Sequence, residues 1–494
     1  MFQHGVASGD PLQDRVILWT RVTSDSTGPT ETTWKVARDP ELNDVVSDGT
    51  GVADPDRDYT VHVDAGGLSP GTTYYYAFEA LGDRSPVART RTLPGPGAEH
   101  MRIAMVSCAS FNAGFFNVYG RIADRDDLDF LLHLGDYVYE TPNMLKPPAP
   151  QPPEIGRPFD PLNECVTLED YRRRYAQYHT DPDLLRLHHL YPIIPILDDH
   201  EYADGAWKAG SSWHRPDQGP YADRKAAALR ARWEWQAIRP PDPEDPERIW
   251  RTTHFGDLVD LFLIDTRTHR DEPKSPPESQ KPGRSNLGFA QRDWLIDELD
   301  ASTARWRILG NASVMGQTWH ENLPEEVRAP LALLKLLGDD GVGPDPDQWD
   351  GYPEERTMLL RHAAEHGFDN LVVLSGDVHV GLVIELHEDS FMGGEPLAVE
   401  FVTPSLTSMN LDDKMGWPRR TEQSLAIERA TLASLPHWKW CDLDSNGYVV
   451  VDVTPDRVLA EFWLVDTVLN PSTHEELGAS WMVEHGKAKA VPAD

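Results

Sequence analysis

The stretch LLHLGDYVYE, residues 131–140, runs from an apolar segment into a glycine, a carboxylate and a phenol. Its beginning has the composition of a strand that is buried on both faces. Asp136 and Tyr139 follow Gly135, at the point where such a strand would end. A plain interpretation exists, because an Asp after a Gly often caps a helix and a nearby Tyr is often part of the core. A functional interpretation requires partners elsewhere in the chain.

The same design recurs between residues 101 and 381. Near-continuous apolar runs end in small or polar residues at MRIAMVSCAS (101–110), YPIIPILDDHE (191–201), LVDLFLIDTR (258–267), RWRILGNAS (305–313) and NLVVLSGDVHVG (370–381). Segments with a helical pattern lie between them, at 168–189, 221–238 and 353–367. This alternation predicts a layered α/β architecture. Ligands of open α/β sheets bind at the carboxyl ends of the strands, where these polar residues lie.

Segments rich in β-forming residues flank this α/β region. Short runs with Thr, Val, Tyr and Trp occur at 15–23, 32–39, 60–66 and 72–80, and turn sequences such as DGTG (48–51) separate them. This spacing predicts a small antiparallel β-sandwich, followed by a linker at 90–100. Strands are expected again at 397–405, 447–455 and 458–466. The proline-rich segment 144–158 is expected to be a loop beside the site.

The charge, apolar content, cysteine content and first residues of the chain argue against several classes of protein. The 494 residues carry a formal net charge of −35, which would repel nucleic acid. No run of 18 apolar residues occurs, so no transmembrane segment is expected. The three cysteines argue against a disulfide framework. The start of the chain lacks the basic and apolar regions of a signal peptide, so we expect a cytoplasmic protein or the mature form of a secreted one.

Side chains with useful chemistry lie at four predicted strand ends. The sequence DDHE (198–201) places charge where burial is costly, unless a metal or another cation compensates it. Asp377 and His379 are two residues apart, so in extended geometry both side chains would face one site. Cys108 is either a buried apolar thiol or, beside carboxylates, a thiolate ligand of a transition metal. Together these residues predict a metal site.

These motifs resemble the PhoD-like alkaline phosphatase and phosphodiesterase family of metallophosphoesterases, which is related to the purple acid phosphatases. GDYVY, DDHE and GDVH occur in the family's order, and FQHGVASGDPLQDRVILWTRVT (2–23) resembles its N-terminal domain. The resemblance covers about residues 1–470 and includes SCAS, where the wider superfamily usually has an Asp-x-His motif. It implies a fibronectin-III-like β-sandwich over residues 1–95 and a four-layer αββα metallophosphoesterase domain over residues 100–480.

The resemblance further implies two neighbouring metal sites. Iron (Fe³⁺) would be bound by Cys108, Asp136, Tyr139 and His379. Calcium would be bound by Asp136, Asp199 and Asp377. The ligand chemistry agrees, because soft thiolate and phenolate groups suit iron and hard carboxylates suit calcium.

The same resemblance implies roles for other residues. His200 would contact the reacting phosphate, and Glu201 would orient His200. Arg267 is a candidate phosphate contact, with a surface or structural role as the alternative. Asp204 stands where the family often has Asn, and Asn311 lies in the region of a further superfamily ligand.

We therefore expect a metal-dependent phosphoric ester hydrolase that acts on phosphate mono- and/or diesters. Metals would bind the phosphoryl oxygens and activate a water for in-line attack. One alternative is a phospholipase D-like phosphodiesterase that acts on phospholipid head groups. A second is a non-catalytic binding protein whose sandwich recognises a partner or a carbohydrate. A metal-independent hydrolase is the third, but GVASGDP (5–11) is not the G-x-S-x-G motif of such enzymes.

Overall fold

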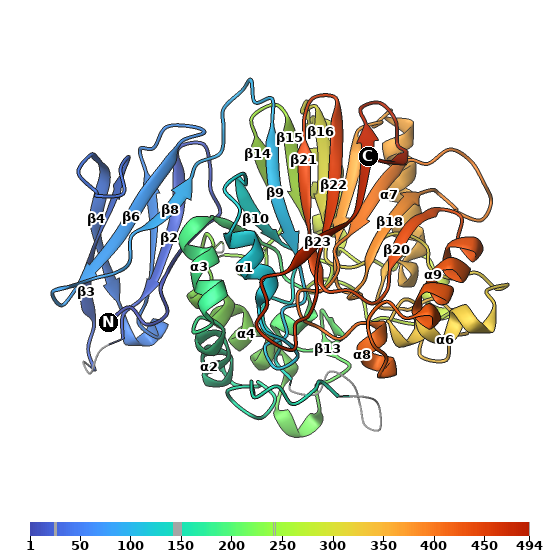
Figure 1. Cartoon of the computed structure of the whole chain (residues 1–494), viewed down its shortest axis with the longest axis horizontal. Helices are drawn as coiled ribbons and strands as arrows, with labels where there is room; N and C mark the ends of the chain where they lie inside the picture. The colour runs from blue at the N-terminus through green and yellow to red at the C-terminus, as the bar shows by residue number, and fades with distance from the viewer. Residues whose placement is uncertain (24–26, 142–150, 241, 243, 494) are drawn as a thin grey trace.

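The computed structural model describes residues 1–23, 27–141, 151–240, 242 and 244–493 (Figure 1). It is a mixed α/β fold built on a ten-stranded and a seven-stranded sheet, with a five-stranded sheet at the N-terminal side (Figure 1). Within the described residues, no helix combines the length and the apolar character needed to cross a membrane.

Parallel strands form the centre of both large sheets. The ten-stranded sheet contains β9 (Met101–Val106), β10 (Phe130–His133) and β11 (Ile193–Pro195) in parallel. The seven-stranded sheet contains β15 (Val259–Leu263), β16 (Trp306–Gly310), β17 (Leu371–Ser375) and β19 (Ala398–Val402) in parallel. The apolar runs of the sequence are therefore strands, as predicted. The polar residues that follow them lie at the carboxyl ends of these strands.

The two large sheets pack against each other and bury a common core. Leu132 of β10 and Ile308 of β16 belong to the same buried cluster. The next residue toward the N-terminus, Leu131, faces the opposite way and packs with helix residues such as Leu184. This alternation follows from the two-residue period of a strand.

Helices cover the outer faces of the two large sheets. Those on the ten-stranded sheet are α1 (Asn117–Ala123), α2 (Leu168–Tyr178), α3 (Pro182–Leu190) and α4 (Tyr221–Trp235). Those on the seven-stranded sheet are α5 (Phe289–Ala301), α6 (Glu325–Leu333), α7 (Pro353–Glu365) and α9 (Glu422–Ser434). The segment 168–189, predicted as one helix, is two. Asp181 caps α3 by accepting the backbone N–H groups of Asp183 and Leu184, and Pro182 starts the new helix.

The N-terminal residues contribute to two sheets. The five-stranded sheet consists of β3 (Thr30–Ala37), β4 (Val45–Ala53), β6 (Thr73–Ala80), β7 (Asp83–Arg84) and β8 (Ala88–Arg91). By contrast, β1 (Val6–Gly9), β2 (Arg15–Arg21) and β5 (Thr60–Gly66) extend the ten-stranded sheet. The link is a parallel pairing of Gly9 with Ile193 of β11. The turn expected at DGTG (48–51) was a wrong prediction, because these residues lie within β4.

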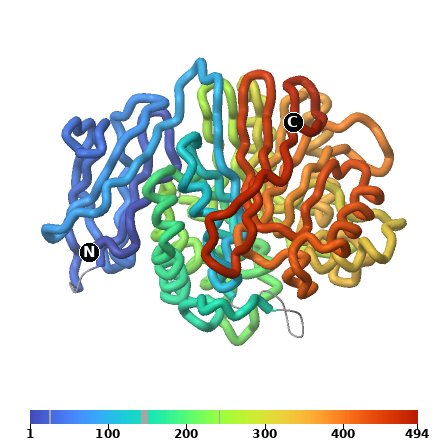
Figure 2. Tube along the Cα trace, in the orientation of Figure 1, coloured from blue at the N-terminus to red at the C-terminus, as the bar shows by residue number. Residues whose placement is uncertain are grey.

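The C-terminal strands return to the first large sheet. β21 (Gly447–Val453) pairs with β9, and β22 (Arg457–Val465), β23 (Glu475–Glu484) and β24 (Ala490–Pro492) follow outward (Figure 2). The remaining strands of the seven-stranded sheet are β14 (Arg251–Phe255), β18 (Gly381–Leu386) and β20 (Trp438–Asp442). Short elements include β12 (Ala206–Trp207), β13 (Gly210–Ser211) and α8 (Leu411–Met415). Among the described residues, five 3₁₀ helices are also present, at Pro55–Arg57, Asp199–Glu201, Pro216–Gln218, Glu278–Gln280 and Trp349–Gly351. Of the predicted loop 144–158, residues 144–150 lie outside the described residues, and 151–158 contain no helix or strand.

Candidate metal centre

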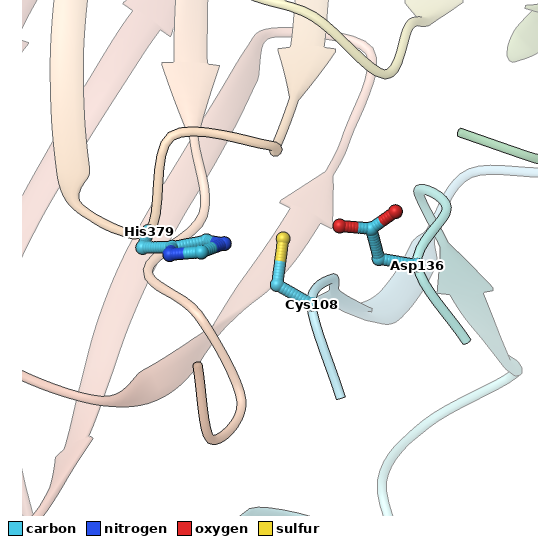
Figure 3. Close-up of side chains that lie close together, drawn as sticks. All are labelled: Cys108, Asp136 and His379. Carbon is cyan, nitrogen blue, oxygen red and sulfur yellow. The ribbon is translucent and has the colours of Figure 1, made fainter. Parts of the chain in front are cut away.

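The four predicted strand ends meet in one place, between the two large sheets. Possible ligand atoms of Cys108, Asp136 and His379 lie within 4.8 Å of one another (Figure 3). The same limit holds for a second group that consists of Asp136, Asp198, Asp199 and Asp377. Asp136 belongs to both groups, so the two clusters adjoin and share one carboxylate. We call them the thiol cluster and the carboxylate cluster.

The backbone at these positions adopts an unusual conformation. Cys108, Asp136, Asp377 and His379 have φ angles of 60°, 55°, 69° and 65°, in the left-handed region that non-glycine residues rarely adopt. Such strain tends to gather at functional sites. The extended geometry expected for Asp377 and His379 is therefore wrong. The left-handed turns direct Asp377 to the carboxylate cluster and His379 to the thiol cluster.

Tyr139 completes the thiol cluster. Its hydroxyl donates to Asp136 Oδ2 at 2.9 Å, accepts from Ser408 Oγ at 2.7 Å and lies 3.2 Å from His379 Nε2. The other ring nitrogen of His379, Nδ1, donates to the carbonyl of Met409 at 3.0 Å. Burial lowers the pKa of His379 to about 3, so the ring is neutral. A neutral imidazole with a bonded Nδ1–H presents its Nε2 lone pair to a ligand.

The buried thiol and phenol of this cluster fit a metal ion. Burial raises the pKa of both Cys108 and Tyr139, and the nearby Asp136 carboxylate raises it further. Neither group would ionise here without a strong positive charge, which a bound metal would supply. The donor set of thiol, phenol, carboxylate and imidazole suits a transition metal.

The carboxylate cluster also fits a cation. Burial and the neighbouring carboxylates raise the pKa of Asp136, Asp198 and Asp377, and Asp198 pairs with Arg267. Asp198 Oδ2 is buried and accepts no hydrogen bond. Gly205 N–H donates to Asp199 Oδ2 at 2.6 Å. Three buried carboxylates and a half-buried one, with one orphaned oxygen, require more positive charge than the described side chains provide. Oxygen ligands of this kind suit calcium.

Arg267 is surrounded by carboxylates. Its side chain is fully buried. Nε contacts Asp198, one Nη contacts Asp347, and the other Nη donates to Asp377 Oδ2 at 3.1 Å. All three nitrogens therefore contact carboxylates. A second arginine, Arg270, donates to Asp347 Oδ1 at 2.5 Å, whereas Arg267 contacts Asp347 Oδ2.

His200 lies beside Tyr139, with ring centroids 4.1 Å apart. Its Nδ1 contacts Glu140 Oε2 at 2.7 Å. Burial opposes a charged ring, but the carboxylates of Glu140 and Asp136 outweigh burial and hold the pKa of His200 well above its ordinary value. With Nδ1 occupied, Nε2 is the nitrogen that can meet a substrate.

Glu201 does not orient His200, contrary to the prediction; Glu140 does. Glu201 instead accepts the backbone N–H groups of Asp136, Tyr137 and Asp198 at 3.0, 2.6 and 2.6 Å. It thus ties the turn after β10 to the turn after β11. Its role is to position the backbone of two ligand-bearing loops.

Comparisons with known proteins show the family of this chain. The family model described as "PhoD-like phosphatase" matches residues 103–462, and "PhoD-like phosphatase, N-terminal domain" matches residues 1–94. The chain belongs to the PhoD-like phosphatase family. Alkaline phosphatase D of Bacillus subtilis (strain 168) is 32% identical over 507 residues, covering 98% of this chain and 81% of that protein. A solved structure described as "Structure of PhoD" has a TM-score of 0.87 and 30% identity, and covers 100% of this chain and 92% of that chain.

Membership of the PhoD-like phosphatase family confirms the resemblance found in the sequence and supports a phosphatase that acts on phosphate esters. Sequence reasoning missed several residues around the site: Glu140, Asp198 as a member of the carboxylate cluster, Asp347, Gln348 and Ser408. Glu140 lies in the quoted stretch GDYVYE, so its place one residue after Tyr139 was a usable signal. Asn311 contacts Ser313, Ser375 and Trp349 and lies in neither cluster.

Proposed function

We propose that this PhoD-like phosphatase is a metal-dependent phosphoesterase that hydrolyses phosphate mono- and/or diesters. The supporting observation is that two clusters of different ligand chemistry share the carboxylate of Asp136. We assign Fe³⁺ to Cys108, Asp136, Tyr139 and His379. We assign Ca²⁺ to the carboxylate cluster, with Asp198 added to the predicted Asp136, Asp199 and Asp377. When bound, such metals supply a Lewis acid and lower the pKa of a coordinated water.

In this proposal the protein side chains position the reacting groups. Glu140 holds the His200 ring through Nδ1. Nε2 can then donate a proton to the leaving oxygen or stabilise charge on the phosphoryl group. Glu201 fixes the loops that carry Asp136 and Asp198.

Arg267 is kept as a candidate substrate contact. Its nitrogens all contact carboxylates in the described structure. Contact with a phosphoryl oxygen therefore requires that bound cations take over part of this negative charge. Asp347 and Arg270 would keep the guanidinium in place while this happens.

We also propose the finer description of the fold. Residues 100–480, with their helices and the strands that they contribute to the two large sheets, would be the four-layer αββα metallophosphoesterase domain. Residues 1–95 would be the β-sandwich, which is supported by a buried core shared by Leu18 of β2, Val61 of β5, Val36 of β3 and Tyr76 of β6.

The test combines metal analysis with two assays of the full chain. Iron and calcium are quantified per chain, and hydrolysis of p-nitrophenyl phosphate and bis-p-nitrophenyl phosphate is measured with and without a chelator. We expect both metals, a visible charge-transfer band from thiolate and phenolate ligation of iron, and activity that is lost on chelation. A colourless, active protein that contains zinc alone would contradict the iron assignment. Activity unaffected by complete metal removal would contradict the proposed function.

A further inference from the structure

A second group of buried carboxylates lies away from the metal centre. Ligand atoms of Glu428, Asp442 and Asp444 lie within 4.8 Å of one another, and the three residues are 6%, 3% and 2% exposed. They come from α9, from the end of β20 and from the loop after it. These elements and α8 lie together on one side of the molecule (Figure 1). We call this group the peripheral cluster.

Asp412 of α8 lies beside the peripheral cluster, close to Asp444, and points to a missing ligand. It is 4% exposed, and in the described part of the chain no N–H or hydroxyl group donates to either of its carboxylate oxygens. The neighbouring groups that act on it are carboxylates: Asp444, with which it can share one proton in a hydrogen bond, and then Asp413 and Asp442. A buried carboxylate that accepts no hydrogen bond is costly, and most such groups in proteins are paired or bind a metal.

One guanidinium compensates the peripheral cluster in part. Arg420 donates from one Nη to Glu428, Asp442 and Asp444 at 2.8, 3.2 and 3.4 Å. Its side chain is 40% exposed, so it covers the cluster from the solvent side. When all four carboxylates are ionised, one guanidinium leaves an excess of negative charge. Burial and the Asp444 carboxylate raise the pKa of Asp412 to about 8, and burial and Asp442 raise that of Glu428 to about 7.

The sequence around the cluster has the spacing of a calcium loop. Asp442, Asp444, Asn446 and Gly447 read D-x-D-x-N-G, which matches the first six positions of an EF-hand loop. The twelfth position of such a loop would be Val453, so the usual glutamate ligand is missing. The carboxylates of Asp412 on α8 and Glu428 on α9 lie beside the loop instead. The Asn446 amide nitrogen donates to Ser405 Oγ at 2.9 Å, which holds the loop in place.

We propose that the peripheral cluster is a divalent-cation site, with calcium as its ion and Asp412, Asp442, Asp444 and Glu428 as its ligands. Calcium accepts six to eight oxygen ligands in irregular geometry, which carboxylates and waters from three separate elements can provide. The ion would join α8, α9 and the loop after β20. This site is separate from the proposed catalytic metals and shares no residue with them.

Asp412→Asn is a clean test, because no N–H or hydroxyl group donates to the oxygens of Asp412 and the Asn amide can replace the hydrogen bond shared with Asp444. The full chain is dialysed against calcium, and calcium and iron are counted per chain. We expect Asp412→Asn to lose about one calcium equivalent and to keep its iron. Glu428→Gln, which can keep the bonds from Arg420 and Leu443 N–H, is expected to behave alike. Glu422→Gln, an equal charge change at an exposed position of α9, is the control and should bind calcium like the wild type.

Thermal unfolding supplies a second readout whose sign separates the two explanations. If calcium binds, the calcium-induced rise in Tm will be smaller in Asp412→Asn than in the wild type. In chelator, at a pH above about 8 where Asp412 is ionised, the variant should be the more stable protein, because the substitution removes repulsion within the cluster. A variant with the wild-type calcium count and an equal calcium-induced rise in Tm would overturn the proposal. Neither readout uses phosphatase activity, so failure of the proposed function would leave this test intact.

Discussion

At the scale of single residues, Asp136 carries the largest part of the proposed chemistry. It belongs to both clusters, accepts from the Tyr139 hydroxyl and from His200 N–H, and sits on a left-handed backbone. The sequence predicted its position because it follows a strand and a glycine. The left-handed conformation of Cys108, Asp377 and His379 could not be predicted, since local propensity disfavours it and tertiary packing imposes it.

Replacing Asp136 with Asn should reduce hydrolysis of both monoesters and diesters by more than tenfold, because one side chain serves two metals. A tenfold loss corresponds to about 1.4 kcal/mol of transition-state stabilisation. The kcat/KM for both p-nitrophenyl substrates measures this, and a circular dichroism spectrum checks the fold. Retention of more than about a tenth of the rate would contradict a bridging role.

Changing His200 to Ala should lower kcat by roughly 10²–10⁴-fold while metal content stays near that of the wild type. The loss should be smaller for p-nitrophenyl esters than for alkyl phosphates, which need protonation of the leaving oxygen. Glu140→Gln should shift the same ratio in the same direction, because Glu140 positions the ring. Metal content that falls together with activity would make His200 a ligand. An equal loss for both leaving groups would assign it to charge stabilisation.

At the scale of elements, helix α2 holds the loop that follows Tyr139, and it lies in a segment that the sequence predicted to be helical. Helix α2 presents Arg174, whose buried guanidinium contacts the carbonyl of Tyr139 and donates to that of Pro161 at 2.7 Å. The helical pattern of 168–189 was recognisable, but its break was missed. The signal was Asp181–Pro182, an N-cap followed by a proline at the first helical position.

The N-terminal cap of α2 offers a prediction at this scale. Thr167 is exposed, and its side chain and that of Asp170 form a reciprocal capping box. Thr167→Ala should lower the free energy of unfolding by about 1 kcal/mol, since it removes a bond to a free backbone N–H. Thr167→Ser keeps the hydroxyl and serves as the control. Denaturant unfolding of both variants measures the effect, and equal stability of the two would show that the cap contributes nothing.

At the scale of the whole molecule, the metal centre lies where the two large sheets meet. Cys108, Asp136 and Asp199 follow strands of the ten-stranded sheet, whereas Asp377 and His379 follow a strand of the seven-stranded sheet. The sequence predicted strands and their polar ends. It could not predict which strands share a sheet, because that depends on pairings between distant segments, such as β9 with β21. The same limit explains why β1, β2 and β5 were not expected to join the ten-stranded sheet.

Because ligands from both sheets meet, bound metals should stabilise the packing of one sheet on the other. Removal of the metals leaves buried like charges facing one another across this junction, with Arg267 as one compensating cation. We therefore expect the Tm of the full chain to fall when a chelator and a reductant strip the metals. Ions present at 1,000 times their dissociation constant contribute about 4 kcal/mol of stability. Calorimetry of the native, stripped and reloaded protein measures this difference.

Asp136→Asn separates the central metal sites from the peripheral cluster, because it disrupts the central sites and leaves the peripheral cluster intact. Its Tm should respond to the chelator less than that of the wild type. An equal response in both proteins would show that the central metals do not stabilise the contact between the sheets.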